Sequence, residues 1–90
     1  MRKEYFLAPI YDSRKSFYGK AKITEVESGN TKIDTIISYD TPVLRVTYDN
    51  NKATFTKLWQ GYSATTMRHI NEYLNQHGFN FGGKAWWDTL

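Results

Sequence analysis

The sequence predicts an α+β domain in which a four- or five-stranded, mostly antiparallel sheet has one helix, at about residues 63–77, packed across it. Two pairs of segments rich in β-branched and aromatic residues are each joined by a short turn sequence. After Ser63 the spacing of the apolar residues changes to a helical period. With 90 residues and no cysteine, the chain has room for one core and no disulfide framework. We therefore expect residues 1–90 to form one domain with an aromatic C-terminal tail at residues 79–90.

The first hairpin is expected at Gly29-Asn30, which suits a two-residue turn. This turn sets Val26 opposite Ile33 on one face of the hairpin. It also sets Glu25 opposite Asp34, and the repulsion between the two carboxylates opposes this register.

The second strand of this hairpin has apolar residues on both of its faces between residues 33 and 39, which is typical of a central strand. We expect the helix to cover one face of the strand and a terminal segment to cover the other. Asp40-Thr41-Pro42 is expected to interrupt the ladder, because Pro42 has no N–H to donate and biases Thr41 away from helix.

A second hairpin is predicted from residues 43–48 and 52–59, with Asn50-Asn51 as a tight turn of positive φ. A two-residue turn sets Val46 opposite Phe55 on an apolar face and places threonines on the other face. One face of this hairpin is therefore expected to be buried and the other to face water.

The helix is expected to begin at Ser63, an N-cap residue, and to end at Gly78, which suits the C′ position. Its core-facing stripe consists of Met67, Ile70 and Leu74. The opposite side, which we expect to face water or a partner, carries Arg68, His69, Glu72 and Gln76. At about 1.5 Å per residue, the helix is about 20 Å long and can cross three or four strands.

The charge balance is weakly basic: 12 Lys and Arg oppose 9 Asp and Glu, a formal net charge of +3. The excess of Lys and Arg over Asp and Glu lies mainly in residues 1–22, whereas residues 23–50 are acidic. This is far from the dense positive stripe of a dedicated duplex-DNA binder. The longest apolar stretch near the start is short, so we expect neither a signal peptide nor a membrane span, and a cytoplasmic location.

Three stretches of the chain resemble a known group of proteins: KSFYGKAK at residues 15–22, SYDTPV at 38–43, and residues 62–74 with the sequences YSATT and RHINEYL. They are similar to a family of short uncharacterised proteins from Gram-positive bacteria, their phages and mobile elements. The resemblance covers about residues 15–79. It implies a mobile-element accessory protein, a class in which inhibitors of host defence such as anti-CRISPR proteins are frequent. No activity and no functional residue come with the resemblance.

Enzymatic chemistry is not expected. Ser63 and His69 fall on different sides of the helix, without the Gly-x-Ser-x-Gly sequence of a nucleophile elbow. His69 and His77 lie eight residues apart, which is not the spacing of metal ligands on one helix face. The carboxylates are scattered, with no pair in an apolar context. We therefore predict no catalytic residue, no metal ligand and no cofactor.

The first of two candidate binding surfaces is a segment in which cations alternate with aromatic rings. Such a segment can hold a nucleic-acid backbone by charge while a ring stacks on a base. Its residues are Arg14, Lys15, Phe17, Tyr18, Lys20 and Lys22. The alternative is the start of a strand, with Phe17 or Tyr18 buried and the lysines in water.

The second candidate surface is the aromatic tail together with the polar side of the helix, and its residues are Phe81, Trp86, Trp87, Arg68 and His69. The tail either folds back over the second face of the sheet or docks on another molecule, because two neighbouring tryptophans are costly to leave in water. The sequence thus favours a non-enzymatic protein-binding module of a phage or mobile element, with inhibition of a host defence complex as its sharpest version. The alternative is a single-stranded nucleic-acid-binding accessory protein, and the oligomeric state is left open.

Overall fold

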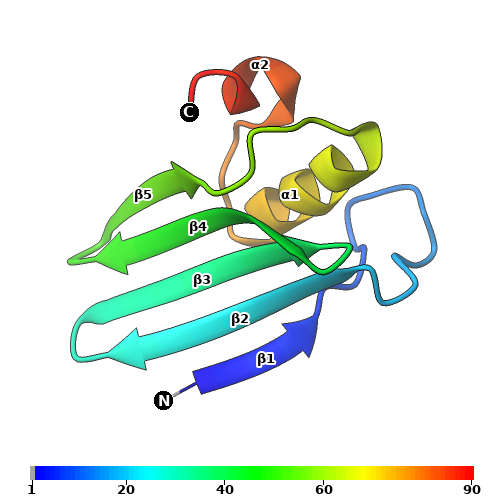
Figure 1. Ribbon diagram of the computed structural model, residues 1–90. Helices are drawn as coiled ribbons and strands as arrows, with labels where there is room; N and C mark the ends of the chain where they lie inside the picture. The colour runs from blue at the N-terminus through cyan, green and yellow to red at the C-terminus, as the bar shows by residue number, and fades with distance from the viewer. Residues whose placement is uncertain (1) are drawn as a thin grey trace.

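A computed structural model describes residues 2–90 and confirms the α+β class (Figure 1). Five strands lie in the sheet in chain order and every neighbouring pair is antiparallel. The strands are β1 (Arg2–Phe6), β2 (Ala21–Ser28), β3 (Thr31–Ser38), β4 (Thr41–Asp49) and β5 (Lys52–Lys57). The helices are α1 (Ala64–Gln76) and α2 (Gly83–Trp87). Among residues 2–90, no helix is long and apolar enough to span a membrane.

Both predicted hairpins are confirmed with their registers. Val26 pairs with Ile33 across β2 and β3, and Val46 pairs with Phe55 across β4 and β5. The prediction that the ladder is interrupted at Asp40-Thr41-Pro42 is wrong. Tyr39 and Asp40 form a two-residue turn with φ of 50° and 65°, and β4 starts directly after it. A register shift between Ile36 and Ile37 leaves Val43 without a partner in β3, and pairing continues at Pro42 and Thr41.

Helix α1 is capped as predicted. The Ser63 hydroxyl accepts a hydrogen bond from the Thr66 N–H at 3.0 Å, and Gly78 follows the C-cap His77 with a φ of 79°. The predicted stripe is buried against the sheet: Met67, Ile70 and Leu74.

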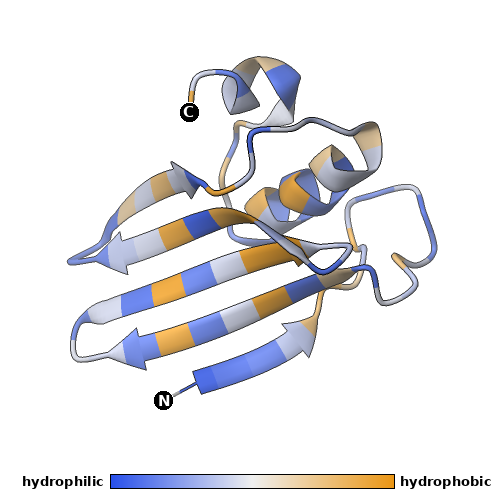
Figure 2. Ribbon diagram, in the orientation of Figure 1, coloured by the Kyte–Doolittle hydropathy of each residue, from blue (hydrophilic) through white to orange (hydrophobic). Residues whose placement is uncertain are grey.

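The sheet has one covered face and one open face. The core packs between α1 and the face formed by Ile23, Ile36, Leu44 and Val46. Figure 2 shows the resulting alternation of apolar and polar bands along β2, β3 and β4. The opposite face presents Arg45, Thr54 and Thr56, which are exposed. One face open to water is common in antiparallel sheets.

The prediction that a terminal segment covers this second face is therefore wrong. The tail does fold back, but it packs beside α1 on the face that α1 already covers. Phe55 is the centre of this contact, with ring centroids 5.2–5.5 Å from three tail rings, those of Phe79, Phe81 and Trp86. The Gly83 N–H donates to Asn71 Oδ1 of α1 at 2.9 Å, which fixes the start of α2. The tail thus extends the cover from α1 to the β5 edge.

The polar side of α1 differs from the prediction as well. His69 and Glu72 were expected at the surface, but each is only 1% exposed. The cause is the loop of residues 7–20 between β1 and β2, hereafter the β1–β2 loop, which packs over this side of the helix (Figure 1). Leu7 and Phe17 of the loop are both buried in the core.

Candidate functional site

The β1–β2 loop is held in place by one helix carboxylate. Glu72 accepts hydrogen bonds from the backbone N–H groups of Ile10, Tyr11 and Asp12 at 3.0, 3.0 and 2.9 Å. Gln76, one turn further along α1, donates to the Ala8 carbonyl at 2.7 Å. A loop without regular structure leaves backbone N–H groups unpaired within its own backbone, and here the helix carboxylate supplies their acceptor.

Asp12 extends this arrangement toward the basic residues of the loop. Its Oδ1 accepts from the Arg14 N–H at 2.9 Å and from Arg68 Nη1 at 2.8 Å. Arg68 is therefore fixed by an ion pair with the loop, and the same carboxylate holds the backbone of Arg14.

The loop, the β3–β4 turn and α1 together enclose a hollow of about 200 Å³. We call it the basic hollow and define it by the polar and aromatic side chains around it: Arg14, Tyr18, Lys20, Tyr39 and Arg68. Two buried rings, Phe17 and His69, also line it. Tyr18 and Tyr39 are 77% and 51% exposed. The hollow thus combines three cations with two exposed aromatic rings.

His69 is held rigidly beneath this hollow. Its Nδ1 lies 2.8 Å from Ser38 Oγ, which lies 2.9 Å from Thr66 Oγ1. The Phe17 ring meets the imidazole edge-on at 4.6 Å, and the Tyr39 ring lies 5.7 Å away. The hydroxyl of Ser38 is itself buried, so this Ser–His contact supports the ring and does not present a nucleophile.

Burial lowers the pKa of His69 below its ordinary value of 6.5; the nearby Asp12 opposes this shift and Arg14 adds to it. As pH falls through 6.5, the unfolded chain takes up a proton that the folded chain does not, so the free energy of unfolding should decrease. Urea denaturation at about pH 7 and about pH 5 measures the change in the free energy of unfolding, and an NMR titration of the His69 ring measures its pKa. A His69 ring that titrates at or above 6.5 would contradict it.

The structure brings together parts of both predicted surfaces. Arg14, Phe17, Tyr18 and Lys20 from the first surface meet Arg68 and His69 from the second. The alternative to a nucleic-acid contact was a strand start in which Phe17 or Tyr18 is buried. Phe17 is indeed buried, but it lies in a loop and not at the start of a strand. Tyr39 was missed, because tyrosine is rare at the first central position of a type I′ turn and the sequence carries no turn signal there.

The remaining predicted residues lie elsewhere. Lys15 is exposed on the loop outside the lining of the hollow. Lys22 lies on the open face of the sheet, where its Nζ is 3.7 Å from Glu4 Oε1. Trp87 is only 2% exposed, donates through Nε1 to the Gly61 carbonyl at 3.2 Å, and lies under Lys57 Nζ. Trp86 is partly buried against Phe81. The tail rings therefore serve mainly as core.

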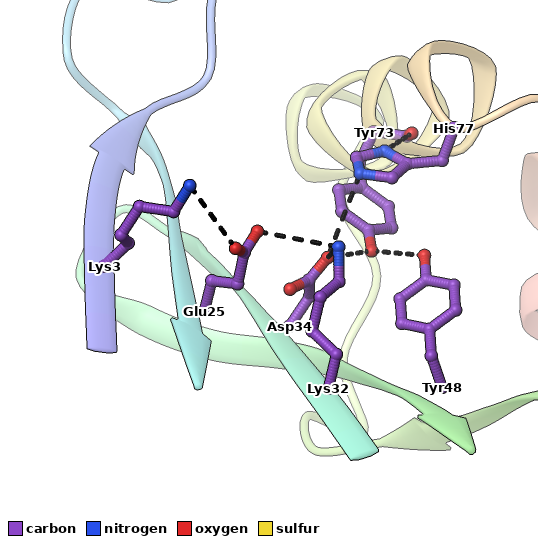
Figure 3. A network of polar contacts seen from close by, with 7 residues as sticks. All are labelled: Lys3, Glu25, Lys32, Asp34, Tyr48, Tyr73 and His77. Carbon is purple, nitrogen blue, oxygen red and sulfur yellow. Dashed lines mark hydrogen bonds and ion pairs between the residues drawn. The ribbon is translucent and has the colours of Figure 1, made fainter. Parts of the chain in front are cut away.

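A second polar cluster lies on the covered face of the sheet, toward the hairpin turns (Figure 3). Buried Asp34 accepts a hydrogen bond of 2.5 Å from the Tyr73 hydroxyl, whose oxygen lies 2.6 Å from that of Tyr48. Lys32 Nζ lies between two carboxylates, 3.6 Å from Glu25 and 3.7 Å from Asp34. Burial, followed by the hydrogen bond to Asp34, raises the pKa of Tyr73, which therefore stays protonated.

This cluster corrects the expectation that no carboxylate pair lies in an apolar context. Glu25 and Asp34 are cross-strand neighbours and both are buried, and the repulsion noted from the sequence is offset by the Lys32 ammonium. His77 also approaches, with Nε2 3.8 Å from Asp34 Oδ2. A more open hollow of about 550 Å³, lined by Lys32, Tyr48 and His77, lies above the cluster. Asp34 is fully buried, and its Oδ2 already binds Tyr73 and Lys32, so we interpret the cluster as support for the sheet and helix. Its Oδ1 has no hydrogen-bond partner among the described residues.

Comparisons with curated proteins and with solved structures gave no match. A family match extends over nearly the whole chain, including the end of β1 and nearly all of the tail, which lie outside the resemblance at residues 15–79. Residues 5–89 match DUF8033, a family of unknown function, and the chain belongs to this family.

Proposed function

We propose that this protein is a non-enzymatic binding module for single-stranded nucleic acid, which it binds at the basic hollow. The observation that carries this proposal is the convergence of Arg14, Lys20 and Arg68 with the exposed rings of Tyr18 and Tyr39. Cations that follow the phosphates and aromatic rings that stack on the bases are the two components of sequence-tolerant single-strand binding.

The size and shape of the surface favour a single strand over a duplex. Aromatic rings can stack only on bases whose faces are free, and a duplex hides those faces. Helix α1 turns its polar side to the β1–β2 loop, so it is not available to enter a major groove. The hollow of about 200 Å³ is also smaller than the roughly 300–1,000 Å³ typical of sites for drug-sized ligands.

A fluorescence anisotropy titration with labelled single- and double-stranded oligonucleotides at two salt concentrations tests the proposal. We expect tighter binding to the single strand and affinity that falls steeply with salt. Lys20→Gln should weaken binding and reduce the salt slope by about 1, because one phosphate contact is lost. Lys52→Gln removes the same charge at the opposite end of the sheet and serves as the matched control.

Two results would count against nucleic acid as the ligand. One is the absence of binding at low salt, where charge contributes most. The other is an equal effect of Lys20→Gln and Lys52→Gln, which would indicate a general response to net charge.

A protein partner is the second candidate, because exposed apolar side chains lie in and beside the β1–β2 loop. Phe6, Ile10 and Tyr11 are all exposed, and large apolar or aromatic side chains of this kind can act as anchors in protein interfaces. In this version the chain is a phage or mobile-element protein that inhibits a host defence complex. It then fails to bind oligonucleotides, and its expression relieves CRISPR interference against a challenging phage.

A further inference from the structure

Two tyrosines beside the basic hollow have backbone conformations that tyrosine rarely adopts. Tyr18 has a φ of 53° and Tyr39 a φ of 50°. In each case the next residue also has a positive φ: 71° at Gly19 and 65° at Asp40. Positive φ at both central residues is the mark of a type I′ turn, and both tyrosines occupy its first central position.

These positions normally take asparagine, aspartate or glycine, because a larger side chain meets the backbone there. The third turn of this kind in the chain follows that preference, with Asn50 and Asn51 at φ of 51° and 66°. It lies at the opposite end of the sheet. The two turns that contain tyrosine therefore carry strain that the comparable turn avoids.

The two strained turns are next to each other. The Tyr39 N–H donates to the Lys20 carbonyl at 2.9 Å, and the Lys20 N–H donates to the Phe17 carbonyl at 2.9 Å. The turns are thus hydrogen-bonded into one unit, and both tyrosine side chains line the basic hollow. Since both rings are also largely exposed, burial in the core does not explain why tyrosine is kept there.

We propose that Tyr18 and Tyr39 form an aromatic clamp for one unpaired nucleobase, with Phe17 and His69 lining the same hollow. The clamp rests on the proposed function and identifies a base as the part of the nucleic acid that enters the hollow. Arg14 and Lys20 then contact the phosphates on either side of that base, while Arg68 keeps its ion pair with Asp12. The hydrogen bonds that join the two turns offset the strain and fix the backbone from which each ring projects, so less order has to be gained when the ligand binds.

Tyr39→Asn tests the clamp, because asparagine suits the turn but cannot stack on a base. We expect the midpoint of urea denaturation to stay the same or rise, while affinity for a short oligothymidylate falls about tenfold. Tyr18→Asn should behave in the same way. Asn50→Tyr is the matched control, since it introduces the same strain at the other end of the sheet; it should lower the midpoint and leave affinity unchanged.

An abasic strand of the same length separates the clamp from the proposed function. If the clamp is correct, the oligothymidylate binds more tightly than the abasic strand, and Tyr39→Asn removes that difference. Equal binding of the two strands overturns the clamp but leaves single-strand binding intact. Binding of neither strand at low salt overturns the proposed function itself. A Tyr39→Asn variant that loses stability as well as affinity also overturns the clamp, because the ring would then be a structural element.

Discussion

Replacing Trp87 with alanine is expected to lower the free energy of unfolding by about 3–5 kcal/mol, the usual cost of truncating a buried aromatic side chain. Trp87 is almost fully buried, and its indole N–H donates to the Gly61 carbonyl. Truncation leaves a cavity between α2 and β5 and leaves the Gly61 carbonyl without this donor. Urea denaturation followed by far-UV circular dichroism measures the effect.

Trp86→Ala is the matched control for this prediction, since Trp86 is only partly buried and should cost clearly less. If Trp87→Ala does not fold, Trp87→Phe keeps a ring in the site and should show an intermediate loss. A cost below about 1 kcal/mol for Trp87→Ala would mean that the tail is not part of the core. Neither residue lines the basic hollow, so oligonucleotide affinity should survive in every folded variant.

Glu72→Gln is expected to lower the free energy of unfolding by about 2–4 kcal/mol, because hydrogen bonds to a charged group contribute about 1.5–3 kcal/mol each. The carboxylate accepts from three consecutive N–H groups of the β1–β2 loop. An amide keeps the volume of the side chain but turns an NH₂ group toward those donors. Residues 10–12 of the loop should then detach from α1, and affinity for single-stranded nucleic acid should fall as well.

The control for Glu72→Gln is the same substitution at Glu4, whose ion pair with Lys22 lies at the surface. Surface pairs of this kind contribute about 0–1 kcal/mol, so Glu4→Gln should change neither stability nor affinity appreciably. Equal effects at the two positions would show that Glu72 does not position the loop. Chemical shift changes at the Ile10, Tyr11 and Asp12 amides locate the effect.

The two hairpins were predictable from the sequence, because alternating side chains and turn residues fix a register locally. Asn50-Asn51 specified the turn and, with it, the pairing of Val46 with Phe55. The caps of α1 at Ser63 and Gly78 are equally local signals. The same kind of signal failed at Tyr39-Asp40, because tyrosine in a type I′ turn runs against the preference on which the prediction depends.

The candidate site was harder to predict, because it depends on contacts between distant parts of the chain. Helical periodicity identified the apolar stripe of α1 but gave no indication that the β1–β2 loop would bury His69 and Glu72. The sequence indicated the loop residues because cations alternate with aromatic rings there. It indicated the helix residues separately, because they lie on the polar side of the helix. That Arg14 and Arg68 share a partner in Asp12 follows only from the fold.

The order of the strands has a consequence for how the protein reaches its native state. Each strand pairs with its neighbour in sequence, so the sheet can assemble through short hairpin closures. The contact between Glu72 and Tyr11 instead joins residues 61 positions apart and must await the docking of the helix. The basic hollow should therefore be completed last during refolding and be among the first regions to open. Amide hydrogen exchange should then be faster at residues 10–12 than in β3. Binding of single-stranded nucleic acid should slow the exchange at residues 10–12.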